Sequence, residues 1–169
     1  WNHIANERFT GMTRRNIMDY NPEVLREAVL NAVCHRDYSI LAPVAIQLDE
    51  TGLTVSSPGG FMRGVDVDNL LTVSPSPRNQ ALADVLKRCG YVERSGRGLD
   101  RIYAGTVASG RPFPDYSQST SERVVLFLRA AHPDAVFMDM LDEAERRRGA
   151  KLNNDDVLVM AALYRHSGA

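Results

Sequence analysis

The chain has 169 residues, of which 44% are hydrophobic and 24% are charged, and its formal net charge at pH 7 is -1. These fractions are typical of a globular domain, and the nearly balanced charge excludes a global electrostatic attraction to nucleic acid or to an anionic membrane. No apolar run approaches the ~20 residues that a membrane-spanning helix needs, and the N-terminus lacks the basic and apolar zones of a secretory signal. We therefore expect a cytoplasmic protein with no membrane partner, and the absence of an initiator Met suggests a piece of a longer chain.

The most informative element is a helix that the sequence predicts to begin at Asn21. Asn21 is a favourable N-cap, Pro22 suits the first helical position, and apolar residues then recur at helical spacing. Glu27, Asn31 and His35 follow at four-residue intervals, so they form a polar ridge in which each lies about 40° further round the helix. A carboxylate, an amide and an imidazole beside a buried face are costly unless they meet one another, water or a ligand. This ridge is therefore a candidate site.

A β-hairpin is predicted next, with strands over 44–48 and 53–56 joined by a turn that contains Gly52. The second strand leads directly into a glycine pair, Gly59 and Gly60. Because glycine has no Cβ, such a pair permits backbone torsions and close approaches that other residues do not.

The middle of the chain combines helical patterns with a Pro-rich loop. We expect a short helix over 66–71, a non-helical loop over 74–77, and a helix over 80–89. The apolar residues of the last helix are expected to face inward: Leu82, Val85, Leu86 and Cys89.

Two further glycines, Gly96 and Gly98, alternate where the next helix should begin, and that helix is expected to end near 109–110. The remaining predicted elements are a strand over 124–128 and helices over 135–148 and 157–165, the last one capped within 153–156. Three arginines close the helix over 135–148, where cations suit the helix dipole. We interpret these arginines as a solvated helix end, with a contact to DNA as the alternative.

The cysteines do not indicate a metal or disulfide site. Cys34 and Cys89 are far apart and lie within predicted helices, so both are interpreted as small core hydrophobes in a reducing compartment. Four scattered histidines likewise give no zinc-binding spacing.

Four motifs carry a resemblance to a known plan: "REAVLNAVCHRDYS", "SSPGG", "PRNQALADVLKRCGYVERSGRGLDRI" and "GRPFPDY". In this order they resemble the ATPase fold that gyrase-type topoisomerases, histidine kinases and mismatch-repair proteins share. Within that superfamily they closely resemble a RecG-like branch named "putative ATP-dependent DNA helicase", whose members are also described as transcriptional regulators. The resemblance covers roughly 19–128.

The resemblance implies an α+β fold, a two-layer α/β sandwich with a mixed, mostly antiparallel sheet and helices on one face. It divides the chain into a linker from a missing N-terminal domain (1–18), an ATPase-like domain (19–131) and a helical extension (132–169) that leads into a truncated winged-helix segment. A Schlafen-type DNA-binding domain typically precedes such a module, so DNA is an expected partner through parts outside this sequence. A homodimer is compatible with this class, although no motif specifies one.

The resemblance also implies roles for two residues of the polar ridge. Asn31 occupies the position whose side-chain oxygen completes the octahedral shell of a Mg²⁺ ion on the nucleotide phosphates. Glu27 occupies the position that orients or deprotonates the attacking water in members that hydrolyse ATP. The implied cofactors are ATP and Mg²⁺, and the implied activity is at most a weak ATPase. Taken alone, the same two residues on a helix are usually a solvated face.

The resemblance assigns the glycines to two boxes of the nucleotide site. The first box corresponds to Ser57, Gly59 and Gly60, and the second to Gly96 and Gly98. The second box places backbone donors at a helix N-terminus, where phosphate oxygens bind readily.

Two departures weaken the expected adenine recognition. Ser57 stands where the superfamily has an adenine-binding aspartate and where the branch usually has asparagine. Phe61 replaces the last glycine of the first box. A neutral hydrogen bond from a serine is worth only ~0.5–1.5 kcal/mol, so adenine recognition is expected to be weak, different or lost.

The segment 63–94 corresponds to the nucleotide lid, with Arg78 as a candidate phosphate contact. His35 and Asp37 belong to the branch's own pattern and are carried as further site candidates without a derived role. The simpler interpretation is a structural histidine followed by a local ion pair of Arg36 with Asp37.

Three functions remain open from the sequence. The first is a nucleotide-binding regulatory module of a DNA-associated transcriptional regulator, with ATP as effector or slow substrate. The second is a degenerate domain that keeps the fold only to dimerise or to couple flanking DNA-binding parts. The third is the ATPase part of a helicase-like machine. The sequence argues against this third function, because it has no Gly-x-x-x-x-Gly-Lys-Ser/Thr phosphate-binding loop.

Overall fold

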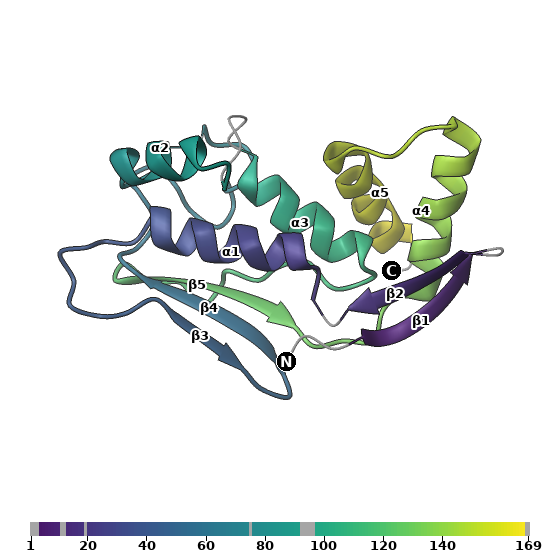
Figure 1. The fold of residues 1–169 in the computed structure, drawn as a ribbon, viewed down its shortest axis with the longest axis horizontal. Helices are drawn as coiled ribbons and strands as arrows, with labels where there is room; N and C mark the ends of the chain where they lie inside the picture. Colours follow the sequence, from purple (N-terminus) through teal and green to yellow (C-terminus); the bar gives the residue numbers. More distant parts are fainter. Residues whose placement is uncertain (1–3, 11–12, 19, 75, 92–96, 168–169) are drawn as a thin grey trace.

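The computed structural model describes residues 4–10, 13–18, 20–74, 76–91 and 97–167, with only the backbone considered for 4–18 and 167. In chain order, the elements are β1 (Ile4–Thr10), β2 (Thr13–Met18), α1 (Pro22–Cys34), β3 (Ala45–Leu48), β4 (Gly52–Pro58), α2 (Gln80–Arg88), α3 (Gly98–Ala108), β5 (Arg123–Arg129), α4 (Ala135–Arg148) and α5 (Asn154–Ser167) (Figure 1). The expected α+β class is confirmed.

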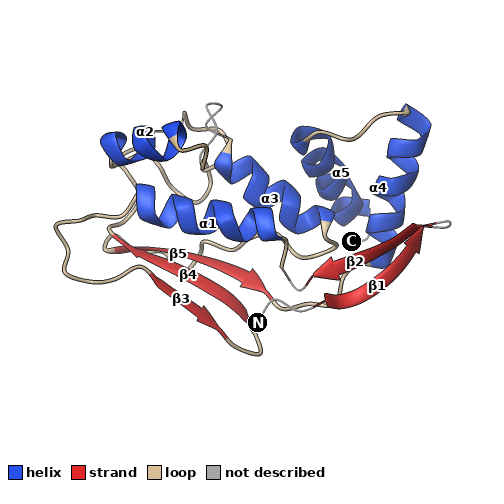
Figure 2. Ribbon diagram, viewed as in Figure 1, coloured by secondary structure: helices blue, strands red, loops and turns tan. Residues whose placement is uncertain are grey.

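The central sheet has three described strands in the order β3-β4-β5, and both strand pairs are antiparallel. β4 is the middle strand, and its Val55 pairs with Ile46 on one side and Leu126 on the other. Helices α1 and α3 lie side by side over one face of this sheet (Figure 2). The expected helix layer on one face is therefore present, whereas the described strands show no parallel pairing between them.

Helix α1 begins as the sequence predicts. The Asn21 side chain accepts a hydrogen bond from the Glu23 amide at 2.9 Å, and Pro22 opens the helix. The close contact of α1 with α3 depends on Gly105, because a methyl group there would lie 2.7 Å from a methyl carbon of Val24. The core between these helices and the sheet is formed by residues that include Val24, Ala28, Ala32, Leu53, Val55, Ile102, Leu126 and Leu128.

The short helix predicted over 66–71 is wrong, because that segment is a series of turns. The Asp66 carboxylate accepts a hydrogen bond from the Asn69 amide at 3.0 Å, and the Asn69 carboxamide accepts one from the Asp66 amide at 2.9 Å. Such short polar side chains offer the backbone partners that compete with helical hydrogen bonds.

Helix α2 forms where it was predicted, but its apolar residues face inward only in part: Leu82 and Leu86 are half-buried, whereas the prediction is wrong for Val85 and Cys89. None of its residues is buried, Val85 is 53% exposed, and Cys89 is exposed as well. In Figure 1, α2 lies beyond α1 rather than on the sheet. The core interpretation is confirmed for Cys34, and burial raises the pKa of its thiol.

The terminal regions contain further regular structure. β1 and β2 form an antiparallel hairpin in the segment interpreted as a linker, and α4 and α5 occupy the segment interpreted as a helical extension. Helices α3, α4 and α5 share a second apolar cluster that includes Phe137 and Ala161. The domain boundaries themselves stay a prediction. Across the described part of the chain, no helix has both the length and the apolar character needed to cross a membrane.

Candidate functional site

Three of the predicted site residues meet where α3 begins beside α1. Glu27 is buried with 3% of its surface exposed, and Asn31 is half-buried one turn further along α1. A methyl group on Gly98, the first residue of α3, would lie 3.1 Å from the Glu27 Oε2 atom and 3.3 Å from the Asn31 carboxamide. The structure therefore brings the carboxylate and the carboxamide together against the Gly98 backbone.

Glu27 has a counter-charge that the sequence analysis did not identify. Arg101 donates from Nη1 to Glu27 Oε1 at 3.0 Å, and Arg26 Nη2 lies 3.9 Å from the same oxygen. Arg101 follows Gly98 by three residues on α3, so both lie on the same side of that helix. A buried carboxylate needs a cation or a hydrogen-bond donor, but the sequence did not specify that Arg101 supplies it.

The Asn31 side chain differs from that of Glu27 in its hydrogen bonding. Its main-chain oxygen accepts the His35 amide at 2.9 Å, but no described residue hydrogen-bonds to its carboxamide. The N-terminus of α3 lies beside it, and Arg97 at the N-cap makes no side-chain capping bond. An amide oxygen and unsatisfied helix N–H groups are suited to bind a metal ion and an anion, respectively.

The first glycine box is closed by the protein's own backbone. The Gly59 amide donates to Glu122 O at 2.8 Å, and the Gly60 amide donates to Ser121 O at 3.1 Å. A methyl group on Gly60 would lie 2.5 Å from that Ser121 oxygen. These glycines therefore let the chain pass close to the start of β5, and their N–H groups are already bonded.

Ser57 is likewise used within the fold. Its hydroxyl donates to Ala32 O of α1 at 2.7 Å, and its residue surface is 5% exposed. Phe61, the other departure in this box, packs against the core, with its ring centroid 6.3 Å from that of Tyr116. Ser57 is therefore engaged by a hydrogen bond and Phe61 by packing within the fold.

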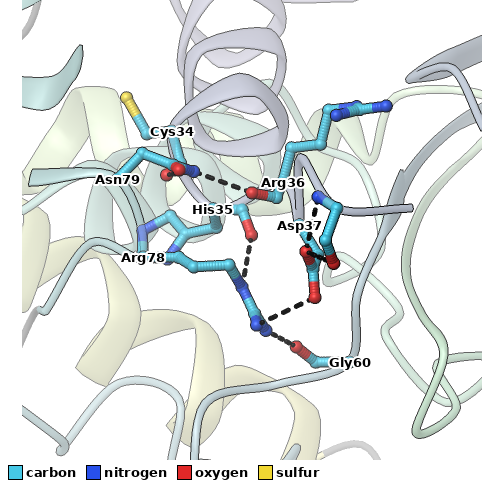
Figure 3. Close-up of polar contacts among 8 residues, drawn as sticks. Cys34, His35, Arg36, Asp37, Gly60, Arg78 and Asn79 are labelled. Carbon is cyan, nitrogen blue, oxygen red and sulfur yellow. Dashed lines mark hydrogen bonds and ion pairs between the residues drawn. The ribbon is translucent and has the colours of Figure 1, made fainter. Parts of the chain in front are cut away.

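Arg78 and Asn79, which we call the Arg78–Asn79 clamp, join this box to the C-terminus of α1 (Figure 3). Arg78 donates from Nε to His35 O at 3.0 Å and from Nη2 to Gly60 O at 2.7 Å, and its Nη1 lies 3.6 Å from Asp37 Oδ2. Asn79 donates from Nδ2 to the carbonyl oxygens of Cys34 and Arg36, at 2.9 and 2.7 Å. The clamp thus satisfies carbonyl groups that the end of a helix leaves open.

Asp37 and Arg78 also fill the space beside Gly59. With φ at +92°, Gly59 adopts a conformation that favours glycine, and a methyl group there would lie 2.6 Å from Asp37 Cβ and 3.4 Å from Arg78 Cζ. Ser39 donates to Asp37 Oδ1 through its hydroxyl and its amide, and these bonds, together with the nearby Arg78, lower the pKa of the Asp37 carboxyl. Burial and the charge of Arg78 lower the pKa of His35.

The expected local ion pair of Arg36 with Asp37 does not form as such. Arg36 donates from Nη2 to the carbonyl oxygens of Ile40 and Ala42, at 2.9 and 2.6 Å, and lies over the Tyr38 ring. The close ion pair of Asp37 is with Arg78. Sequence adjacency was misleading because the main-chain oxygens of the following loop compete for the guanidinium.

The remaining predicted positions fall outside this arrangement. Gly96 lies outside the described residues. At the end of α4, Arg146 and Arg147 pair with Glu143 at 2.9 and 2.8 Å, and Arg148 pairs with Asp156. Within the ranges that the structure describes, no group of three or more His, Cys, Asp or Glu side chains is arranged to hold a metal ion.

Comparison with known proteins identifies a matching family and a related solved structure. The family described as "Putative ATP-dependent DNA helicase recG C-terminal" matches residues 42–127, which include Ser57, Gly98 and Arg101 but not α1. The crystal structure of the DIP2311 protein from Corynebacterium diphtheriae is similar over 94% of this chain, with 29% identity and a TM-score of 0.75. The match covers 32% of that protein, so this chain spans about a third of its length. No curated protein matches the sequence.

Proposed function

The chain belongs to the family described as "Putative ATP-dependent DNA helicase recG C-terminal", and on this premise we propose that it is a regulatory module that binds ATP with Mg²⁺. We propose further that its layers are those of the gyrase- and histidine-kinase-type ATPase fold, and that it serves a DNA-associated transcriptional regulator. Contacts to DNA would come from parts outside this sequence, and a homodimer is a compatible assembly.

The observation that carries this proposal is the Asn31 carboxamide. It is half-buried, has no hydrogen-bond partner among the described residues, and lies beside both the buried Glu27 carboxylate and the uncapped start of α3. Mg²⁺ prefers oxygen ligands and keeps several waters when it binds nucleotide phosphates. The residues present fit such a group: Asn31 would offer one oxygen to the metal, and the amides at the start of α3 would bind the phosphates.

The environment of Glu27 favours binding over rapid hydrolysis. A general base must be able to reach and deprotonate a water. Glu27 is 3% exposed and already accepts a charge-assisted hydrogen bond from Arg101. We therefore expect ATP to act as an effector or as a slow substrate.

A degenerate scaffold is the second candidate, and the first glycine box favours it. The Ser57 hydroxyl and the Gly59 and Gly60 amides all have partners within the chain. If the adenine end has lost its recognition groups, the fold would serve only to couple flanking parts or to dimerise. A helicase motor is the least supported candidate, for want of a phosphate-binding loop in the sequence.

Calorimetric titration with Mg·ADP and Mg·ATP separates the first two candidates. We expect saturable binding by the unmodified chain and at least a tenfold loss in Asn31→Ala, or about 1.4 kcal/mol. Gln47→Ala, which removes an exposed carboxamide from β3, is the matched control and should bind like the unmodified chain. Absence of both heat and a melting shift at millimolar nucleotide would establish the scaffold instead.

A further inference from the structure

The Glu27 side chain places a carboxylate in a buried position, where charged groups are uncommon. Its side chain is 4% exposed, and it lies between α1 and α3, with Oε2 directed at the Gly98 backbone. Removing a carboxylate from water is unfavourable unless a cation and hydrogen bonds compensate for the lost hydration. The cations beside Glu27 therefore determine how well the lost hydration of its carboxylate is compensated.

Two arginines approach Glu27 Oε1, and their environments differ. Arg101 Nη1 is 3.0 Å away and its side chain is 22% exposed, whereas Arg26 Nη2 is 3.9 Å away and its side chain is 51% exposed. Water and salt reach the half-exposed Arg26 guanidinium, so at the longer distance it contributes less than Arg101. Arg101 is therefore the stronger counter-charge of this carboxylate.

The same carboxylate borders the place where phosphates are proposed to bind. A methyl group on Gly98 would contact both Glu27 Oε2 and the Asn31 carboxamide, so the two side chains flank one short stretch of backbone. A polyphosphate held at Asn31 would lie close to Glu27. In a partly buried site, an uncompensated negative charge at that distance repels the phosphates more strongly than it would in water.

We propose that Arg101 is a positioning residue that sets the affinity of this site for phosphate groups by compensating the charge of Glu27. This inference rests on the proposed nucleotide binding and names the residue that tunes it. Arg101 acts through Glu27: it holds Oε1, fixes the orientation of the carboxylate, and offsets its charge before a nucleotide arrives. The loss of affinity on removing Arg101 therefore grows with the number of phosphate charges.

The test compares AMP with ATP, both with Mg²⁺, by calorimetric titration of the full chain. Arg101→Met keeps the aliphatic stem and should weaken ATP binding at least tenfold while changing AMP binding less than threefold. Arg101→Lys should recover most of the ATP affinity, because it restores the charge. Arg26→Met is the matched control and should change neither ligand by more than about twofold, since the Arg26 guanidinium lies 3.9 Å from Glu27 Oε1 on a side chain that is 51% exposed.

Two variants without the Glu27 charge keep the proposal falsifiable if Arg101→Met folds poorly. Glu27→Gln should bind ATP more tightly than the unmodified chain, and the double variant Glu27→Gln, Arg101→Met should regain the ATP-to-AMP affinity ratio that Arg101→Met loses. An equal loss for AMP and ATP in Arg101→Met would show a purely structural role. Unchanged ATP binding in both Glu27→Gln and Arg101→Met would also overturn the proposal.

If the proposed function itself is wrong, the titrations give a different result from those above. In that case the unmodified chain binds neither AMP nor ATP, and the inference about Arg101 falls with it. If the unmodified chain binds ATP and the ratio does not respond to Arg101, nucleotide binding stands and only the charge-compensating role of Arg101 is rejected.

Discussion

The two glycine boxes use the same residue type for opposite purposes. Gly59 and Gly60 lie against Asp37 and the Ser121 backbone, and both of their amides are bonded within the chain. Gly98 instead lies against the polar ends of Glu27 and Asn31, at the start of a helix that no described side chain caps. A glycine in a nucleotide-type motif therefore does not by itself indicate a ligand, since the atoms that occupy the missing Cβ position decide its role.

This difference separates the two ends of the proposed nucleotide site. At the phosphate end, the Asn31 carboxamide has no hydrogen-bond partner among the described residues, whereas at the adenine end the Ser57 hydroxyl is engaged in holding β4 to α1. The comparison predicts that changes at the first box affect stability and that changes at Gly98 affect binding.

The largest expected effect is a loss of stability in Gly59→Ala. The new methyl group would lie 2.6 Å from Asp37 Cβ in a backbone conformation with positive φ, so we expect a loss of about 3 kcal/mol in the free energy of unfolding. Gly64→Ala is the matched control, because Gly64 has φ at +84° but nothing within 4 Å of the added methyl group. Urea denaturation measures both. Equal losses in the two variants would show that Gly59 is required only for its torsion.

Arg78→Met should give the next largest loss. It removes the donors to the His35 and Gly60 carbonyl oxygens and the ion pair with Asp37, which we expect to cost about 2 kcal/mol. Arg88→Met, at an exposed position on α2, is the control and should be nearly neutral. If Arg78→Met leaves stability unchanged but abolishes nucleotide binding, Arg78 is a ligand contact rather than a clamp.

Gly98→Ala should weaken nucleotide binding more than it lowers stability, the opposite of what we expect for Gly59→Ala. The methyl group would lie 3.1 to 3.3 Å from the ends of two side chains that can move, so the loss of stability should stay below about 1 kcal/mol. Mg·ADP binding should nevertheless weaken about tenfold, because Asn31 and Glu27 must shift, and about 1.4 kcal/mol of binding is lost. If Gly98→Ala loses as much free energy of unfolding as Gly59→Ala, the two glycine boxes do not differ in their structural roles.

The smallest effect concerns His35 and pH. Because the pKa of His35 is lowered in the folded protein, the unfolded chain binds a proton as the pH falls through about 6.5 while the folded chain does not. Stability should therefore decrease from pH 7.5 to pH 5.5, and His35→Gln should decrease less over the same interval. Denaturation at the two pH values measures this difference, and an equal or larger decrease in His35→Gln would contradict it.

The sequence predicted the elements whose signals are local. The Asn21 cap with Pro22, the hairpin and the start of α3 follow from residues within a few positions of one another, and all are present. The turn at Asp66 and Asn69 was missed because side chains there compete for backbone hydrogen bonds.

The contacts that define the site were harder to predict because they join distant parts of the chain. The approach of Gly98 to Asn31 was implied only by the family resemblance that the motifs carry. The pair of Glu27 with Arg101, 74 residues apart, and that of Arg78 with Gly60 depend on how the elements pack. Sequence periodicity could show that Glu27 needs a partner, but it could not identify which cation supplies it.

The most direct test of this account is an NMR titration of the ¹⁵N-labelled chain with Mg·ADP. The account predicts saturable shifts that are largest for the Gly98 amide and the Asn31 side-chain amide, with little change at the amides of Gly59 and Gly60. Shifts concentrated at Gly59 and Gly60, or no shift anywhere at millimolar nucleotide, would contradict it.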